Sequence, residues 1–355
     1  MFKQPLIAID IGSSSIKVVE LSGSSSRRLR SIGLEMLPVG AVQDGQIQNQ
    51  DAVTSALKNL LAKLKIRPFG RRASIGLSSS SVLIKKILVD AQKQADLSEV
   101  VFYEAEQHFQ TDMSEIYFDY SKLGDLTQES SDTPVLIVGA KREIVESYIG
   151  LVRSIGMRTG IVDCNVFAAA NMLEFNYGAF DAITALVNVG ASSTQIILVH
   201  QGQYVYTRDL PIGGDEYSRR IMELLSIDRE NAETFKVGSS TGDGNVPPEL
   251  TRLLAEINDQ LVHEVQLAID YFLQSGEAPQ NLGIGSVFLT GGSSRVLGLD
   301  AAMAAALQLP VQIINPFQKI DISPGKFQMD YILLQGHLYG VAVGLGLRAL
   351  SDNTR

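Results

Sequence analysis

A repeated segment of 15 residues most constrains how this chain folds. Residues 7–21 read IAIDIGSSSIKVVEL, and residues 185–199, 178 positions further on, read ALVNVGASSTQIILV. In both copies an apolar stretch is followed by Asp or Asn, a glycine near a Ser/Thr cluster, and a second apolar stretch. This pattern is typical of a β-hairpin with a tight turn. The repeat therefore predicts two related halves.

The rest of the chain favours an α/β fold. Helical spacing of apolar residues predicts helices at 51–66, 97–110, 143–155, 249–274 and 297–308. Short apolar runs predict strands at 73–77, 82–89, 116–120, 135–141, 204–208 and 287–290. Strands in runs, separated by helices, favour twisted mixed sheets. A length of 355 residues suggests two domains or one large bilobal fold.

Charge and composition exclude several classes of function. The 30 Lys and Arg residues against 39 Asp and Glu give a net charge of −9, which argues against a nucleic-acid partner. A single cysteine and four histidines without zinc-ligand spacing argue against a disulfide or a structural metal. The uncharged stretch 331–347 contains four glycines and is expected to be one buried helix, not a membrane span. No secretory signal is recognised, so we expect a cytoplasmic protein that meets a membrane only through a partner.

The two predicted hairpin turns suit an anionic ligand. Turns of this kind place several backbone N–H groups where an anion can bind. Two of them facing each other across a cleft would hold the phosphates of one nucleotide, although turns with Gly and Ser are also common in ordinary α/β proteins. Segments 123–134 and 238–248 are expected to be surface loops, and the second lacks the Gly-Lys-Ser/Thr ending of a P-loop.

Several motifs, in this order and spacing, resemble the actin, heat-shock-70 and sugar-kinase superfamily, and most closely its FtsA/PilM branch. The motifs are DIGSSSIK at 10–17, VNVGASST at 187–194, RDLPIGG at 208–214, AETFK at 232–236, LTGGSS at 289–294 and GVAVGLGLR at 340–348. The resemblance covers nearly the whole chain. It implies an actin-like (ribonuclease H-like) bilobal α/β fold with two related halves and an extra subdomain.

The resemblance also implies a site for ATP or ADP with Mg²⁺. The candidate nucleotide-binding residues are Asp10, Gly12, Ser13, Ser14, Lys17, Gly190, Ser192, Ser193, Thr194, Gly213, Gly214, Glu233, Lys236, Gly291, Gly292 and Ser293. Asp10 is the candidate metal residue, since Mg²⁺ keeps several waters and takes only one or two carboxylates. Lys17 is either a point charge for the phosphates or an ordinary solvated lysine.

Two further pairs are expected at the sugar and the base. Glu233 and Lys236 lie three residues apart and either reach the ribose hydroxyls or form a surface ion pair. Gly291 and Gly292 leave room for an adenine, and the predicted helix after them suggests binding at a helix N-terminus.

Asn188 departs from the pattern of ATP-hydrolysing members, which carry an acid in the second phosphate motif. An amide is neutral, so it cannot act as a base or bind a metal as strongly. Segment 163–171, expected at the connection between the lobes, shows no residue for positioning an attacking water. No catalytic residue is assigned. We expect tight nucleotide binding with hydrolysis absent or slowed by about a hundredfold or more.

The resemblance implies a division into five parts. Residues 1–80 form the core of the first lobe, 81–160 the extra subdomain, 161–185 the interlobe connection, 186–335 the second lobe, and 336–355 a C-terminal helix that returns to the first lobe.

The implied function is that of a cytoplasmic adaptor in the inner-membrane assembly platform of a type IV pilus. Its implied partner is the cytoplasmic N-terminal peptide of a PilN-like inner-membrane protein, held in the groove between the extra subdomain and the first lobe. Further possible partners are other platform proteins and motor ATPases. A homo-oligomer or ring is also left as a possibility. The alternatives are a filament-forming protein like FtsA or MreB, and a small-molecule kinase of the sugar or acetate kinase class. A kinase of this class needs a general base next to an acceptor hydroxyl, and the sequence offers no convincing candidate.

Overall fold

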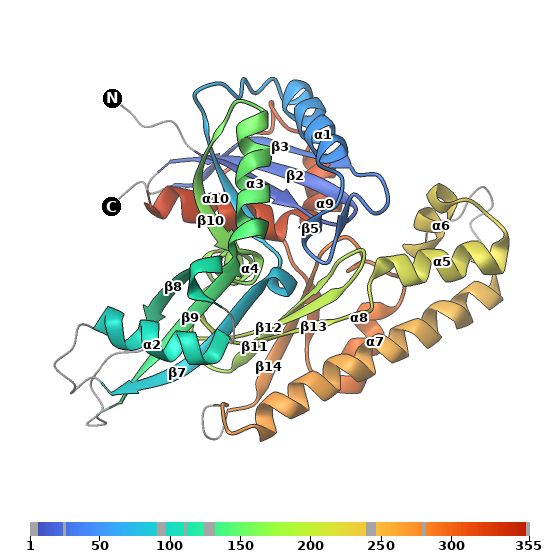
Figure 1. Ribbon diagram of the computed structural model, residues 1–355. Coiled ribbons are helices and arrows are strands. Elements are labelled where there is room, and N and C mark those ends of the chain that lie inside the picture. Colours follow the sequence, from blue (N-terminus) through green and yellow to red (C-terminus); the bar gives the residue numbers. More distant parts are fainter. Residues whose placement is uncertain are drawn as a thin grey trace.

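The computed structural model describes residues 6–23, 26–90, 97–109, 112–123, 132–238, 246–278 and 282–352. Two lobes, each built on a five-stranded mixed sheet, stand one above the other in Figure 1, and a smaller α/β unit lies beside them. Most of segments 123–134 and 238–248, the two expected loops, lies outside the described residues. The α/β fold class is confirmed, and so are both predicted hairpins.

Lobe 1 carries the first hairpin in a sheet of order β10-β6-β1-β2-β3. Its strands are β1 (Ile7–Ile11), β2 (Ser15–Ser22), β3 (Arg28–Met36), β6 (Arg72–Leu77) and β10 (Arg158–Cys164), with a small hairpin of β4 (Val42–Gln43) and β5 (Gln46–Ile47). Successive side chains of a strand point to opposite faces. Ile7 and Ile9 therefore pack with α1 (Gln50–Lys63) and α3 (Arg142–Ser154), while Ala8 packs with α10 (Gly340–Asp352).

Lobe 2 repeats this plan in a sheet of order β13-β12-β11-β14-β15. Its strands are β11 (Ile183–Val189), β12 (Thr194–His200), β13 (Gln203–Leu210), β14 (Ile284–Thr290) and β15 (Val311–Ile313). Helices α7 (Pro248–Gln274) and α8 (Leu299–Leu307) share a hydrophobic cluster with one face of this sheet. Helices α5 (Gly214–Leu225) and α6 (Arg229–Lys236) lie with α7 at the right of Figure 1.

The smaller unit is a three-stranded sheet of order β7-β9-β8 with one helix. It comprises β7 (Val82–Asp90), α2 (Leu97–Phe109), β8 (Ile116–Lys122) and β9 (Asp132–Lys141), with 3₁₀ turns at Ser79–Ser81 and Met113–Glu115. The structure differs here from the expected subdomain 81–160. Helix α3 packs in the core of lobe 1, and β10, which begins before residue 160, pairs with β6.

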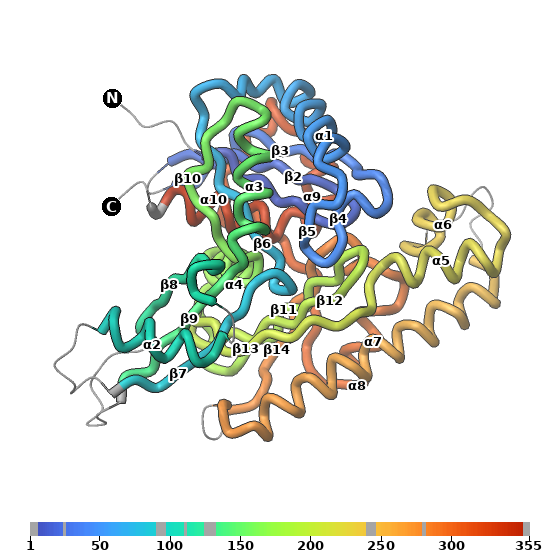
Figure 2. The backbone as a smooth tube through the Cα atoms, viewed as in Figure 1, coloured from blue at the N-terminus to red at the C-terminus, as the bar shows by residue number. Residues whose placement is uncertain are grey.

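The C-terminal segment lines the junction of the lobes. The single buried helix expected at 331–347 is wrong, because α9 (Met329–Gln335) is separated from α10 by a 3₁₀ turn at Gly336–Tyr339. Helix α10 packs on α4 (Asn165–Tyr177) and on β1 and β2, so this helix lies against lobe 1, as Figure 2 shows. Among the described residues no helix is both long and apolar enough to cross a membrane.

Candidate functional site

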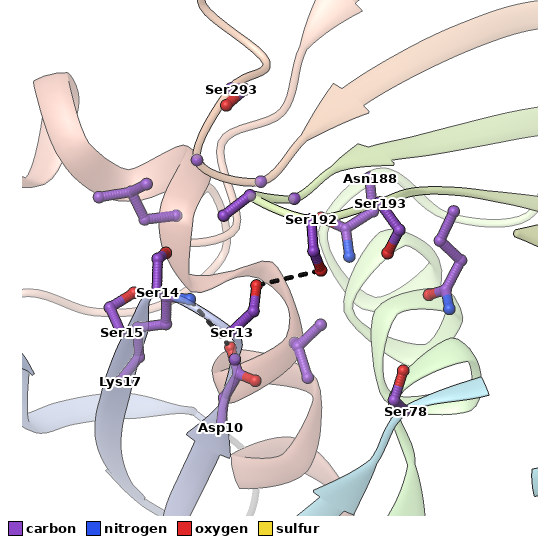
Figure 3. A pocket seen from close by; sticks show the side chains of 18 of the residues that line it. Asp10, Ser13, Ser14, Ser15, Lys17, Ser78, Asn188, Ser192, Ser193 and Ser293 are labelled. Carbon is purple, nitrogen blue, oxygen red and sulfur yellow. Dashed lines mark hydrogen bonds and ion pairs between the residues drawn. The ribbon is translucent and has the colours of Figure 1, made fainter. Parts of the chain in front are cut away.

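A cavity of about 690 Å³ separates the two lobes, and most of the candidate residues line it. The candidates in its wall are Asp10, Gly12, Ser13, Ser14, Lys17, Asn188, Gly190, Ser192, Ser193, Glu233, Lys236, Gly291, Gly292 and Ser293. Figure 3 shows them arriving from opposite sides, with the Asp10 hairpin on one side and the Asn188 hairpin on the other. Three candidates, Thr194, Gly213 and Gly214, are not part of the wall.

The two hairpin turns have the same local geometry. In lobe 1 the N–H of Gly12 donates to Ser15 O at 3.0 Å, and in lobe 2 the N–H of Gly190 donates to Ser193 O at 2.9 Å. The turns face each other, since Ser192 Oγ donates to Ser13 Oγ across the cleft at 3.2 Å (Figure 3). A phosphate between the lobes would take the place of this weak contact and accept from both hydroxyls.

Asp10 and Lys17 face each other across the first hairpin. They are register partners on β1 and β2, and Lys17 Nζ lies 3.7 Å from Asp10 Oδ2. Burial raises the pKa of the Asp10 carboxyl, and the nearby Lys17 ammonium lowers it in part. The equivalent partners in lobe 2 are Asn188 and Gln195. The ion pair of lobe 1 is therefore replaced in lobe 2 by two neutral amides, and Asn188 and Gln195 both line the cavity.

The three candidates outside the wall hold the second turn in place. The N–H of Gly214 donates to Gly190 O at 2.9 Å, and Thr194 Oγ1 donates to Ile212 O at 2.7 Å. A Cβ on Gly213 would lie 2.4 Å from Ala191 O. The beginning of α5 is thus packed against the turn. These three residues support the backbone of the turn without lining the cavity.

Glu233 and Lys236 form an ion pair of 2.5 Å on α6, and both line the cavity. The pair is half-buried, because the Lys236 side chain is 4% exposed and the Glu233 side chain 44%. Lys236 Nζ also donates to Ser218 Oγ at 3.1 Å, and Ser218 donates to Glu233 Oε1 at 2.5 Å. A carboxylate held in this way has its remaining acceptor capacity available to a hydroxyl in the cavity.

The structure around the Gly-Gly turn at residues 291–292 differs from the expected one. The helix after it begins at Leu299 and not at residue 297, so six residues separate Gly292 from that helix. The turn is held by two backbone bonds, from Gly291 N to His337 O at 3.0 Å and from Ser293 N to Val189 O at 2.9 Å. The first of these bonds ties it to the 3₁₀ turn before α10.

Several wall residues were missed by the sequence reasoning. They are Ser78, Ser80, Asn165, Gln195, Asp209, Asp215, Arg229, Tyr331 and Gln335, with Asp44. Asn165, in segment 163–171, lines the cavity, but its Oδ1 is buried against Gly76 and has no hydrogen-bond partner in the described structure. The absence of a residue for positioning an attacking water in this segment stays a prediction. Gln195 could have been found from the repeat, because it occupies the position of Lys17 in the second copy.

A second link between the lobes lies at one side of the cavity. Ser79 Oγ donates to both carboxylate oxygens of Asp209, at 2.7 and 2.6 Å, and Gln195 Nε2 donates to Ser79 Oγ. Ser79 lies in the 3₁₀ turn directly before β7. Two residues of the cavity wall, Gln195 and Asp209, therefore contact the smaller unit directly.

Two related halves with facing Gly-Ser turns around an interlobe cavity define an actin-like protein. The sequence profile of the type IV pilus assembly protein PilM family matches residues 8–350, so the chain belongs to this family. Among solved structures, the chain is similar to a PilM-PilN type IV pilus biogenesis complex, with a TM-score of 0.84, 23% identity, and coverage of 98% of this chain and 99% of that chain.

More distant relatives share the fold. MreB 5 of Spiroplasma citri, solved with AMPPNP, matches with a TM-score of 0.56 and 13% identity over 100% of this chain and 99% of that chain. Cell division protein FtsA of Bacillus subtilis is 23% identical over 87% of this chain and 78% of its own length. FtsA of Pseudomonas aeruginosa is 22% identical over 98% of this chain and 90% of its own length.

Proposed function

We propose that this chain is an ATP-binding cytoplasmic adaptor of the type IV pilus inner-membrane assembly platform. Its partner in this proposal is the cytoplasmic N-terminal peptide of a PilN-like inner-membrane protein. The match of the PilM family over residues 8–350 carries the proposal. The similarity to a structure described as a PilM-PilN complex supports the choice of partner.

The charged residues of the cavity favour a nucleotide that is bound together with Mg²⁺. The wall holds five carboxylates (Asp10, Asp44, Asp209, Asp215 and Glu233) but three cations (Lys17, Arg229 and Lys236). Each cation is paired with one of the carboxylates. A bare triphosphate would therefore be repelled, whereas a divalent cation between it and Asp10 offsets the excess negative charge.

The cavity residues bind and orient the nucleotide in this proposal. Ser13 and Ser192 donate to phosphate oxygens from the two turns, and Glu233 accepts from a ribose hydroxyl. Asn188 holds no charge with which to take a proton from a water near the phosphates.

The Asn188→Asp variant tests this view of hydrolysis. We expect the purified protein to carry ATP with negligible turnover, and the variant to release phosphate about 10- to 100-fold faster because a carboxylate returns to the second turn. Chromatography of the heat-released ligand and a steady-state phosphate-release assay measure both quantities. Asn59→Asp, an exposed change on α1, is the matched control. Rapid turnover by the unaltered protein would contradict the expectation.

We propose that the partner peptide binds along β10. Lobe 1 in this proposal includes α3 and β10, and the smaller unit runs from β7 to β9. β10 is an edge strand that pairs only with β6 among the described strands, so its outer backbone groups can accept an added strand. A cavity of about 460 Å³ lies between β10 and α3 and is lined by Ile149, Met157, Ile161 and Val162, with Arg153, Arg158, Thr159 and Gly160. Apolar side chains of an extended peptide fit such a cavity.

Val162→Lys should weaken peptide binding by about 10-fold or more, because it places a charge in the apolar part of the groove. The side chain is 37% exposed, so the fold tolerates the change. Val39→Lys, at an 82% exposed position of lobe 1, is the matched control. Fluorescence anisotropy of a labelled peptide measures both affinities. Equal affinities of Val162→Lys and the unaltered chain would remove β10 from the proposal.

The FtsA relatives favour filament formation as the second candidate function. Sedimentation with and without Mg-ATP distinguishes the two. The adaptor stays a monomer or a small closed ring, while a filament-forming protein pellets when the nucleotide is added.

A further inference from the structure

Basic residues are segregated at one end of lobe 1. Residues 58–73 contain six Lys or Arg and residues 150–162 contain two, and neither segment contains any Asp or Glu. This absence is unexpected in a chain with 39 acidic and 30 basic residues. The two segments lie side by side, because the N–H of Arg158 donates to Arg71 O at 3.0 Å and Arg158 is in register with Arg72. They form the top of lobe 1 in Figure 1, where α1 and α3 end.

An exposed aromatic residue, Phe69, lies between these cations in the sequence, two residues after Arg67 and three before Arg72. Phe69 is 91% exposed. It occupies a tight turn closed by the bond from Arg71 N to Pro68 O at 3.0 Å, and Gly70 takes the positive φ of 78° that such a turn requires. A Cβ on Gly70 would meet nothing within 4 Å, and the same is true of Gly156 in the neighbouring connection. The turn is therefore open to the surroundings at Gly70 and Gly156, and Phe69 is not among the residues that line the cavity beside β10.

The cations around Phe69 are available to a partner. Exposed Lys65, Arg67, Arg72, Arg153 and Arg158 make no ion pair with any carboxylate in the described structure. Lys63 and Arg71, by contrast, are paired with Glu35 and Glu20. We call Lys65, Arg67, Phe69, Arg72, Arg153 and Arg158 the basic tip.

We propose that the basic tip is a peripheral contact site for an anionic lipid surface. Each Lys or Arg close to such a surface adds attraction that extends about one Debye length, roughly 8 to 10 Å at physiological ionic strength. The net charge of −9 does not prevent this contact, because carboxylates further away are screened. The Phe69 ring enters the headgroup layer, where exposed aromatic side chains are favourable.

The shape favours a lipid surface over an acidic protein. A protein partner ordinarily receives an exposed aromatic side chain in a pocket and surrounds it with a polar rim. A turn with one fully exposed ring and exposed cations before and after it in the sequence matches a broad, deformable, negatively charged layer. β10 begins at the basic tip with Arg158 and runs away from it, so a peptide tethered in the membrane would enter the proposed groove at this end.

Vesicle sedimentation of the purified full chain tests the proposal without the peptide. We expect binding to vesicles of phosphatidylglycerol and phosphatidylcholine at low salt, no binding to phosphatidylcholine alone, and loss of binding at high salt. The triple variant Arg67→Ala, Arg72→Ala, Arg158→Ala should bind the anionic vesicles about 100-fold more weakly. Phe69→Ser should reduce binding less, and it should leave the salt dependence unchanged.

The matched control changes three exposed cations elsewhere: Lys141→Ala, Arg252→Ala and Lys319→Ala. It alters the net charge equally and should bind as the unaltered chain does. Failure of the unaltered chain to bind anionic vesicles, or equal losses in both triple variants, would overturn the proposal. Binding to polyglutamate as tight as to the vesicles would assign the tip to an acidic protein and would also overturn it. Circular dichroism confirms that each variant is folded.

Discussion

Replacing Asp10 with Asn should abolish the magnesium dependence of ATP binding. The carboxylate lies at the end of β1, lines the cavity and is 6% exposed. In our proposal it holds the waters of Mg²⁺, and an amide of the same size cannot attract the metal. We expect the affinity for ATP with Mg²⁺ to fall about 10- to 100-fold. The affinity for ATP without Mg²⁺ should not fall and should rise slightly, because one carboxylate that repels the bare triphosphate is gone. Isothermal titration with and without Mg²⁺ measures both.

The pH dependence provides a second readout of the same group. Because burial raises the pKa of Asp10, its carboxylate takes up a proton at a higher pH than an exposed aspartate does. Binding of Mg-ATP should therefore weaken as the pH falls through this raised pKa, and the dependence should be absent in Asp10→Asn. The stability of the metal-free protein should depend on pH in the opposite direction. Because the pKa of Asp10 is raised, the folded protein binds this proton more tightly than the unfolded chain does. The stability that Asp10 contributes is therefore present at low pH and is lost as the pH rises. Asp119→Asn, an exposed change in the smaller unit, is the control. An unchanged magnesium dependence in Asp10→Asn would exclude this role for Asp10.

Gly344→Ala should destabilise the protein more than any exposed substitution. Helices α10 and α4 approach so closely that a Cβ on Gly344 would lie 1.8 Å from Ala168 O and 2.3 Å from its carbonyl carbon. Backbone atoms of a buried helix cannot move aside as a flexible side chain can, so the two helices must separate. We expect a loss of about 3 kcal/mol or more in the free energy of unfolding, which thermal or denaturant unfolding measures.

Gly150→Ala is the matched control, since it makes the same change in α3, where a Cβ would meet nothing within 4 Å. This variant should be more stable by about 0.5 to 1 kcal/mol, because alanine restricts the unfolded chain and favours the helix. A Gly344→Ala variant as stable as the unaltered protein would mean that α4 and α10 are not packed as described. Because this pair joins the lobes behind the cavity, the nucleotide affinity of Gly344→Ala should fall as well.

The sequence was most informative where a pattern repeats. The 178-residue offset predicted both hairpins, and with them the two turns that Ser13 and Ser192 bring face to face. The motif order predicted most of the cavity wall, including residues more than 200 positions apart such as Asp10 and Glu233. A repeat works this well because hairpin formation is local and its hydrophobic pattern fixes the register of the strands.

The remainder depended on tertiary packing. Asp209 lies in the motif at 208–214 and Asn165 in segment 163–171, but neither pattern indicates that their side chains face the cavity. They reach it because β10 and β13 end there. Segment 331–347 reads as one helix by composition, yet it is interrupted at Gly336–Tyr339, where the carbonyl of His337 accepts from Thr290 and Gly291. The assignment of α3 failed for a similar reason. Its amphipathic pattern shows that one face is buried but not which sheet buries it.

The most direct test of the account is the binding of the cytoplasmic N-terminal peptide of a PilN-like inner-membrane protein to the purified chain in the presence of Mg-ATP. Isothermal titration gives the affinity and the stoichiometry in one experiment, and a peptide of the same composition in scrambled order is its control. An adaptor binds one peptide per chain in a saturable way and does not bind the scrambled peptide. Absence of saturable binding, by a folded chain that binds Mg-ATP, would contradict the adaptor function while leaving the nucleotide site intact.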